Sequence, residues 1–189
     1  MNLNKAMVLA MLATLAISAG AQAQSQTQAQ DPQQTPLAAA KPETFQDWQL
    51  FCPEPNGSVK ARVCEIRTVS TGKDGRKLGA LAVAAITEVE TKKSEIIASA
   101  LVPLGVDLRA DPALKIDDGQ PMGLKFVRCL QRGCEAMMPL SAEQQAAMQS
   151  GTKARVAVGV GGTEKAILEF SLNGFTAALN TLKQRTGAK

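Results

Sequence analysis

Apolar and polar residues alternate in short segments through most of the chain after residue 43. Residues 62–70, 153–160 and 165–170 alternate with a period of two, which is typical of strands with one buried face. Two further segments, residues 78–87 and 94–102, are apolar on both faces and predict strands in the middle of a sheet. The remaining predicted strands cover residues 45–52, 113–116, 122–130 and 135–140.

Turn-forming residues separate these segments, so we expect hairpins between 45–52 and 62–70 and between 113–116 and 122–130. Many short strands with few helices predict a mainly β fold, an antiparallel β-sandwich or an open barrel. The alternation predicts that six side chains of the last two strands face the core: Val156, Val158, Val160, Ala166, Leu168 and Phe170. The small side chains along one central strand would allow a second layer to approach closely: Ala80, Ala82, Ala84 and Ala85.

One short helix and a C-terminal helix interrupt the strands. Ser141 and Gln144 form a capping-box pattern ahead of a helix that ends near Gly151. Lys183 and Arg185 suit the last turn of the second helix, where cations interact favourably with the helix dipole. Its apolar residues recur at helical spacing and predict packing on the core, with a partner groove as the alternative: Phe175, Ala178, Leu179 and Leu182.

The first 23 residues have the pattern of a secretory signal peptide. Lys5 precedes an apolar run over residues 6–17, and Ala21 and Ala23 match an A-x-A cleavage rule. The apolar run is shorter than the ~20 residues that a transmembrane helix needs. The alternative to a signal peptide is a buried N-terminal helix. We therefore expect cleavage near Gln24. The mature protein is expected in the periplasm or outside the cell, and association with the outer membrane is one form of this prediction.

Residues 24–42 are rich in Gln, Ala and Pro and contain one large apolar residue, Leu37. Such a segment cannot bury enough apolar surface to offset the entropy of ordering it, so it is predicted to be a disordered spacer. The remaining residues, 43–186, have the length of a single domain with a substantial core.

The chain has four cysteines, Cys52, Cys64, Cys129 and Cys134. An even number in an exported chain favours disulfides, and four cysteines allow three pairings. Strand phase favours pairing of sequence neighbours, because Cys52 and Cys64 both point to the core side of their strands and Cys129 and Cys134 flank a hairpin-sized connection. A metal site or a reactive thiol pair is the alternative, and neither a zinc-finger spacing nor C-x-x-C supports it.

Composition excludes several mechanisms. The chain has no His, which removes Ser-His-Asp and Cys-His catalysis and imidazole metal ligands. The formal charge of +4 is spread along the chain without aromatic stacking platforms, so nucleic-acid binding is not expected. We expect no cofactor and no metal, and after signal cleavage no transmembrane segment.

Four aspartates lie close together in the sequence: Asp107, Asp111, Asp117 and Asp118. They could supply oxygen ligands to Ca²⁺ or a carboxylate pair for glycoside hydrolysis. Asp-Pro and Asp-Asp-Gly are also ordinary turn sequences, and no EF-hand spacing is present. Turn formation is the favoured interpretation.

Residues 45–182 resemble the invasion-associated locus B family of exported proteobacterial proteins. The resemblance rests on Trp48, the four cysteines, and residues 100–108 (ALVPLGVDL), 116–119, 126–136 (FVRCLQRGCEA) and 170–179 (FSLNGFTAAL). It implies a secreted or periplasmic, envelope-associated β-sandwich, named for a role in host-cell invasion in a pathogenic relative, and it implies no catalytic residue.

Export, disulfides and the missing catalytic residues together favour a non-enzymatic protein that acts through contacts with an envelope or host-surface protein whose identity is unknown. Two other hypotheses stay open. One is a periplasmic enzyme that uses the aspartate carboxylates, and the other is a small module that binds a ligand or inhibits a protease.

Overall fold

The computed structural model describes residues 41–53, 61–88 and 90–189, and everything below refers to them. The predicted signal peptide, residues 1–23, lies outside this range, as does the predicted spacer apart from Lys41 and Pro42. The first described element begins at Glu43 and the last ends at Thr186.

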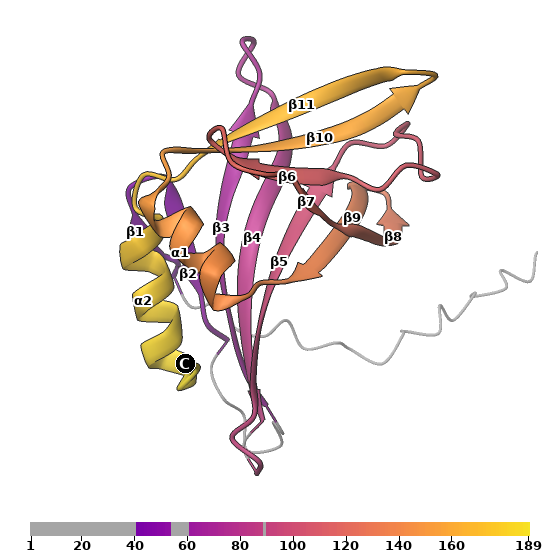
Figure 1. Ribbon diagram of the computed structural model, residues 1–189. Helices are drawn as coiled ribbons and strands as arrows, with labels where there is room; N and C mark the ends of the chain where they lie inside the picture. Colours follow the sequence, from indigo (N-terminus) through magenta and orange to yellow (C-terminus); the bar gives the residue numbers. More distant parts are fainter. Residues whose placement is uncertain (1–40, 54–60, 89) are drawn as a thin grey trace, which may run out of the picture. The chain divides into compact units, whose positions relative to one another are not determined.

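A seven-stranded antiparallel sheet forms the larger layer, with strand order β1-β2-β3-β4-β5-β9-β8 (Figure 1). The two segments that are apolar on both faces, β4 and β5, lie in the middle of this sheet as expected. The strands run over Glu43–Phe45 (β1), Trp48–Phe51 (β2), Ala61–Thr71 (β3), Lys77–Glu88 (β4), Ser94–Val102 (β5), Lys125–Leu130 (β8) and Gly133–Pro139 (β9).

A smaller four-stranded sheet has the order β11-β10-β6-β7 and packs through β11 against β3 and β4 of the large sheet. Leu168 of β11 reaches Gly79 of β4, where a Cβ would lie 3.4 Å from a Leu168 methyl group and only 2.5 Å from the Leu101 carbonyl oxygen. The strands run over Ala113–Ile116 (β6), Met122–Gly123 (β7), Lys153–Gly161 (β10) and Glu164–Ser171 (β11). The predicted mainly β, two-layer antiparallel fold is confirmed, and it is not a closed barrel.

Both predicted helices are present. Helix α1, Ala142–Ser150, begins with the expected capping box, in which Ser141 and Gln144 each accept a hydrogen bond from the other's backbone N–H. Helix α2, Phe175–Thr186, carries Lys183 and Arg185 in its last turn. The predicted apolar stripe of α2 is buried and packs on β2, β3 and β4, so it belongs to the core.

Two predicted strands are each interrupted. Residues 45–52 are not one strand but β1 and β2, joined by a tight turn in which Gln46 has a φ of 54°. Residues 122–130 split at Leu124, whose side chain is fully buried and whose N–H donates to the carbonyl of Pro112. As a result β7 pairs with β6 in the small sheet, whereas β8 pairs with β9 in the large one.

Two of the expected core side chains are exposed. Val160 and Ala166 lie at the β10–β11 hairpin, where the register shifts between Gly159 and Gly161. The bulge interrupts the alternation at Val160. Ala166 is still in register opposite the buried Val158, but it lies near the end of the hairpin and is exposed. Val156, Val158, Leu168 and Phe170 are buried as predicted.

The core lies between the large sheet on one side and the small sheet with α2 on the other. Trp48 of β2 is fully buried, packs edge-on against Phe175 of α2 at 4.9 Å between ring centroids, and donates its indole N–H to the Ser171 carbonyl at 3.0 Å. Helix α2 starts next to β1 because Gly174 is a glycine: its φ is 89°, and a Cβ would lie 2.1 Å from the Phe45 carbonyl oxygen.

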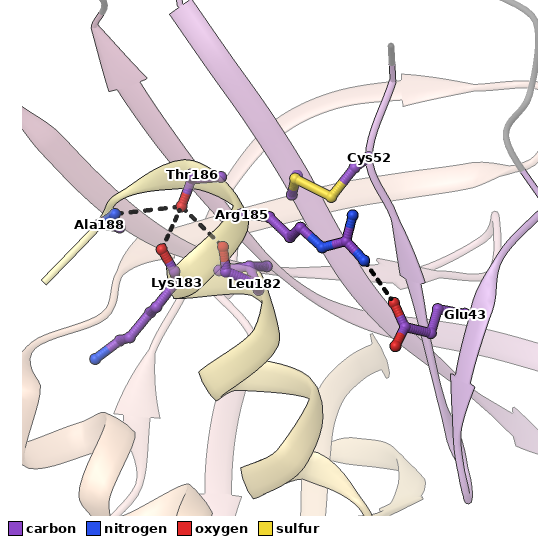
Figure 2. Close-up of a disulfide and its surroundings, with 8 residues drawn as sticks. Glu43, Cys52, Leu182, Lys183, Arg185, Thr186 and Ala188 are labelled. Atoms are coloured by element: carbon purple, nitrogen blue, oxygen red, sulfur yellow. Dashed lines mark hydrogen bonds and ion pairs between the residues drawn. A yellow bond between two sulfur atoms is a disulfide. The ribbon is translucent and has the colours of Figure 1, made fainter.

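The structure pairs Cys52 with Cys64 and Cys129 with Cys134, the neighbour pairing that strand phase favours. The first disulfide ties the end of β2 to β3 close to the C-terminal end of α2, where Arg185 forms an ion pair with Glu43 of β1 (Figure 2). The second links β8 to β9 beside their tight turn. Each disulfide therefore fixes a strand pair near one border of the large sheet.

Candidate interaction surface

The large sheet has one face turned away from the core, and we call it the outer face. Among the described residues, the elements that pack on β3 and β4 from outside the sheet are α2 and β11, and both lie on the inner face. Cross-strand register assigns nine apolar side chains to the outer face: Val63, Val69, Ala80, Ala82, Ala84, Ile86, Ile97, Leu101 and Met137.

The outer face is more apolar than the solvent-facing side of a two-layer protein usually is. Val63 and Val69 of β3 are 40% and 43% exposed. A strand with one buried face normally carries polar side chains at such outward positions. On β4 the outward positions Ala80, Ala82 and Ala84 form a low strip between the longer side chains of β3 and β5. Of the nine apolar side chains, Val63 and Val69 are exposed, Ala82 is 6% exposed and the other six are partly exposed. Exposed apolar surface of this kind can mark an interaction site.

Two arginine–carboxylate pairs border the strip. On β3, the Arg67 Nε lies 3.7 Å from a Glu65 carboxylate oxygen, and the guanidinium stacks over Phe51 at 4.5 Å from the ring centroid. On the other border, Arg128 of β8 donates to Glu135 of β9 at 2.8 Å. The two borders thus carry both signs of charge.

Glu65 is the least satisfied of these charged groups. Partial burial on the outer face raises the pKa of Glu65, the neighbouring Arg67 opposes that rise, and the negative charge of Glu135 adds to it. Its carboxylate accepts no hydrogen bond from the described part of the chain, and its cation lies at 3.7 Å, longer than a charge-assisted hydrogen bond. A cation from a binding partner would improve this environment.

Three of the four predicted aspartates have separate partners: Asp107, Asp111 and Asp117. Asp107 accepts from the backbone N–H and the guanidinium of Arg109, with the shortest distance 2.8 Å. Those hydrogen bonds lower the pKa of Asp107 to about 2. Asp111 forms an ion pair with Lys125 of β8. Asp107 therefore fixes local chain geometry, as the turn interpretation expects, whereas the Asp118 carboxylate accepts no hydrogen bond within the described residues.

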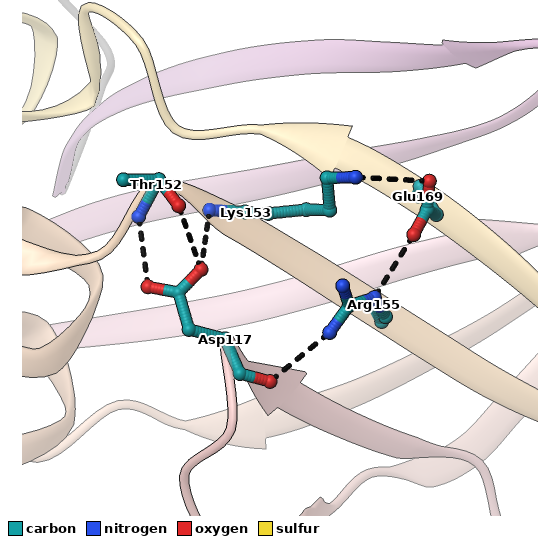
Figure 3. Close-up of polar contacts among 5 residues, drawn as sticks. All are labelled: Asp117, Thr152, Lys153, Arg155 and Glu169. Carbon is teal, nitrogen blue, oxygen red and sulfur yellow. Dashed lines mark hydrogen bonds and ion pairs between the residues drawn. The ribbon is translucent and has the colours of Figure 1, made fainter.

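Asp117 has the most extensive contacts of the four (Figure 3). Its carboxylate accepts from the N–H and hydroxyl of Thr152 and from the N–H of Lys153, at 2.8 to 3.0 Å. These hydrogen bonds, the Thr152 backbone first, lower the pKa of Asp117. Its carbonyl accepts from Arg155, which also pairs with Glu169 at 2.9 Å, so Asp117 connects β6 to β10 and β11.

No group of three or more Asp, Glu, Cys or His side chains within the described ranges is placed to hold a metal ion. A pocket of about 270 Å³ lies beside Asp117, between the β6–β7 turn and the end of α1, and its apolar lining includes Ile116, Met122 and Ala147. The Asp117 carboxylate at its edge already accepts three hydrogen bonds. This arrangement fits a structural role better than a catalytic one.

The comparisons with known proteins agree with this fold. A model of the Invasion associated locus B (IalB) protein family matches residues 48–183. The chain belongs to this family. Invasion protein B homologs of Brucella abortus, from strain 2308 and from biovar 1 strain 9-941, are each 31% identical to it over 151 residues, which cover 79% of the chain and 83% of the homolog.

The invasion associated protein B of Bartonella henselae, known from a crystal structure, has the same fold. It superposes with a TM-score of 0.62 at 21% identity, over 77% of this chain and 96% of the other. In the described residues, no helix has the length and the apolar character needed to cross a bilayer.

The sequence contained part of the signal for the outer face. Residues 78–87 and 94–102 are apolar on both faces, and the alanines of β4 suggested close approach of a second layer. In the described structure the second layer covers the inner face, which includes Ala85. Ala80, Ala82 and Ala84 point the other way.

Proposed function

We propose that this protein is exported and acts without catalysis, as an envelope-associated or secreted protein that binds another macromolecule through the outer face of its large sheet. The observation that carries the proposal is the apolar outer face itself, since leaving such a face in water forgoes the stabilisation that its burial would give. Its polar border would give a contact its specificity.

Export is supported by two features of the chain. The first residues have the pattern of a cleavable signal peptide, the cysteines form two disulfides, and disulfides persist in oxidising compartments. The relatives named for invasion fit a surface-acting role. The lack of His and the separate partners of Asp107, Asp111 and Asp117 favour binding over catalysis.

A site-specific photo-crosslinker tests the proposal in intact cells of the native organism. We place it at Ala84 on the outer face and, as a matched control, at Ala157, which is partly exposed on the solvent side of the small sheet. The expected result is a discrete crosslinked species from the Ala84 position only, recovered from the envelope or the medium. Equal labelling from both positions, or recovery of the protein from the cytosol with its leader intact, would contradict the proposal.

A further inference from the structure

We infer that the partner of the outer face is a basic, apolar segment of another exported protein, and that it binds at the end of the face next to the β4–β5 turn. The inference rests on the proposed function, because it names the chemistry of the partner for the same surface. Three observations support it: the apolar side chains that register gathers at this end, the charge around them, and the incomplete contacts of Glu65.

Cross-strand register gathers four apolar side chains at this end of the face, and we call them the apolar patch. Ile86 of β4 lies opposite Val63 of β3, and in the next row Ala84 of β4 lies opposite Ile97 of β5. Val63 is exposed and the other three are partly exposed. Burial of these side chains against apolar groups of a partner would be favourable.

Three carboxylates on neighbouring strands border the apolar patch. Glu65 of β3 and Glu95 of β5 each lie opposite a β4 residue of the patch, and Glu88 lies on the same face of β4 itself. Among the described strand residues at this end, the cation on the same face is Arg67. The strands therefore place three carboxylates against one guanidinium here, although the chain as a whole has a formal charge of +4.

The surroundings of this end do not reverse its charge. The turn that joins β4 to β5 adds three charged residues: Glu90, Lys92 and Lys93. With all three counted, acidic side chains still outnumber basic ones by four to three. At the other end of the face, Lys125 and Arg128 are already paired with Asp111 and Glu135. Charge complementarity therefore favours a basic partner.

Glu65 is the carboxylate best placed to receive a cation from that partner. It is partly buried, the Arg67 Nε lies 3.7 Å away, and the same guanidinium stacks over the ring of Phe51. A Lys or Arg side chain could cover the apolar patch with its aliphatic stem and reach Glu65 with its charged end.

An extended polypeptide matches the spacing of these groups. Its side chains on one face recur at about 6.8 Å, which is two residues of a strand. The same two-residue spacing separates Val63 from Glu65 on β3, and Ile86 from Ala84 on β4. A segment that alternates apolar and basic residues would therefore present each kind of side chain at a suitable interval.

The test measures binding of synthetic peptides to the mature protein, with both disulfides intact, by fluorescence anisotropy. One probe alternates Val with Lys over about eight residues, and the other alternates Val with Glu over the same length. The Val-Lys peptide is expected to bind at least tenfold more tightly, and the difference should shrink as salt is added. Equal affinities, or no binding of either peptide up to about 1 mM, would overturn the inference.

Glu65→Gln combined with Glu95→Gln removes two charges and preserves the side-chain shapes. This double variant is expected to weaken binding of the Val-Lys peptide at least tenfold. Glu143→Gln combined with Glu164→Gln is the matched control, since both residues lie outside the large sheet, and it should leave the affinity unchanged. An equal loss in the two double variants would overturn the inference, because the peptide would then respond to net charge alone.

The photo-crosslinker at Ala84 distinguishes failure of this inference from failure of the proposed function. In cells, Glu65→Gln with Glu95→Gln is expected to reduce the Ala84 crosslink at least tenfold. A crosslink that persists at full yield, or one that joins Ala84 to residues 24–40 of the chain itself, would refute the basic partner segment. Full yield to another protein would still leave the outer face as a docking surface. Absence of any Ala84-specific crosslink in the parent chain would refute both.

Discussion

Asp117 shows how one carboxylate joins segments that are distant in the sequence. Its donors at Thr152 and Lys153 lie 35 and 36 residues further along the chain, at the start of β10. The residue adopts a φ of 42°, which Asp and Asn tolerate better than most residues. The sequence indicated the turn, but not the long-range partners, because hydrogen bonds between distant segments leave no local pattern.

We expect Asp117→Asn to lower the midpoint of thermal unfolding by a few degrees without changing the fold. The amide can keep the turn conformation, yet it loses the charge and replaces one accepting oxygen with a donor that faces other donors. Circular dichroism melts measure the effect. Asp118→Asn is the control, since the Asp118 carboxylate accepts no hydrogen bond within the described residues; an equal loss in both variants would contradict this account.

The aspartates also predict how stability depends on pH. The pKa of Asp107 is lowered to about 2 by hydrogen bonds from Arg109, and the pKa of Asp117 is lowered by those from Thr152, each from an ordinary value of 3.8. A carboxyl with a lowered pKa in the folded state stabilises the fold above its ordinary pKa, and this contribution is lost as the pH falls through the lowered value.

The free energy of unfolding should therefore fall as the pH is lowered from about 4 to about 2, the window set by these two carboxyl groups. Urea titrations across this range measure it, and Arg109→Gln should make the dependence shallower by removing the donor to Asp107. An NMR titration in which Asp107 keeps an ordinary pKa in the wild-type chain would show that the hydrogen bonds from Arg109 are not the cause of the pH dependence.

At the scale of the elements, two neighbouring residues of β11 lie on opposite faces of the strand, one in the core and the other in solvent. Leu168 is 4% exposed and reaches Gly79 of the large sheet, whereas Ile167 is 60% exposed on the other side of the strand. Leu168→Ala is expected to cost about 2–5 kcal/mol of unfolding free energy because it leaves a cavity between the sheets. Ile167→Ala should change it by less than about 0.5 kcal/mol. Chemical denaturation distinguishes the two, and similar losses would mean that β11 does not form the second layer.

The disulfides act at the same scale, each on one strand pair. Cys52 and Cys64 are 12 residues apart and Cys129 and Cys134 are 5 apart. In the chain-entropy description, replacing the first pair with Ala should lower the free energy of unfolding by about 3 kcal/mol and replacing the second pair by about 2 kcal/mol. Denaturation of the two double variants measures this order, and a larger loss from the shorter loop would contradict it.

Most strands were predictable because each has its own alternation or apolar run, and both helices because each has a cap or a stripe. The breaks within the predicted strands were not predictable from local sequence. The turn at Gln46 depends on the nearby Asn173 and Gly174, which come from the far end of the chain, and the break at Leu124 depends on a bond to Pro112. Likewise, strands that are apolar on both faces indicate that both faces of the sheet are buried, but the sequence does not indicate what covers each face.

At the scale of the whole molecule, every member of the buried core lies between Trp48 and Ala188, and the ion pair of Arg185 with Glu43 joins the last helix to the first strand. The core thus draws on both ends of the described chain and on both sheets. Such a core should unfold as one cooperative unit.

A chain that begins at Lys41 is therefore expected to unfold in a single transition, with the same midpoint as the mature protein that begins at Gln24. The comparison is informative for the outer face as well. If residues 24–40 covered that face, their removal would expose apolar surface, lower the midpoint and increase binding of an apolar dye. If those residues leave the face uncovered, both chains should show the same midpoint and the same dye binding. Thermal melts and dye-binding measurements on both chains distinguish the two outcomes.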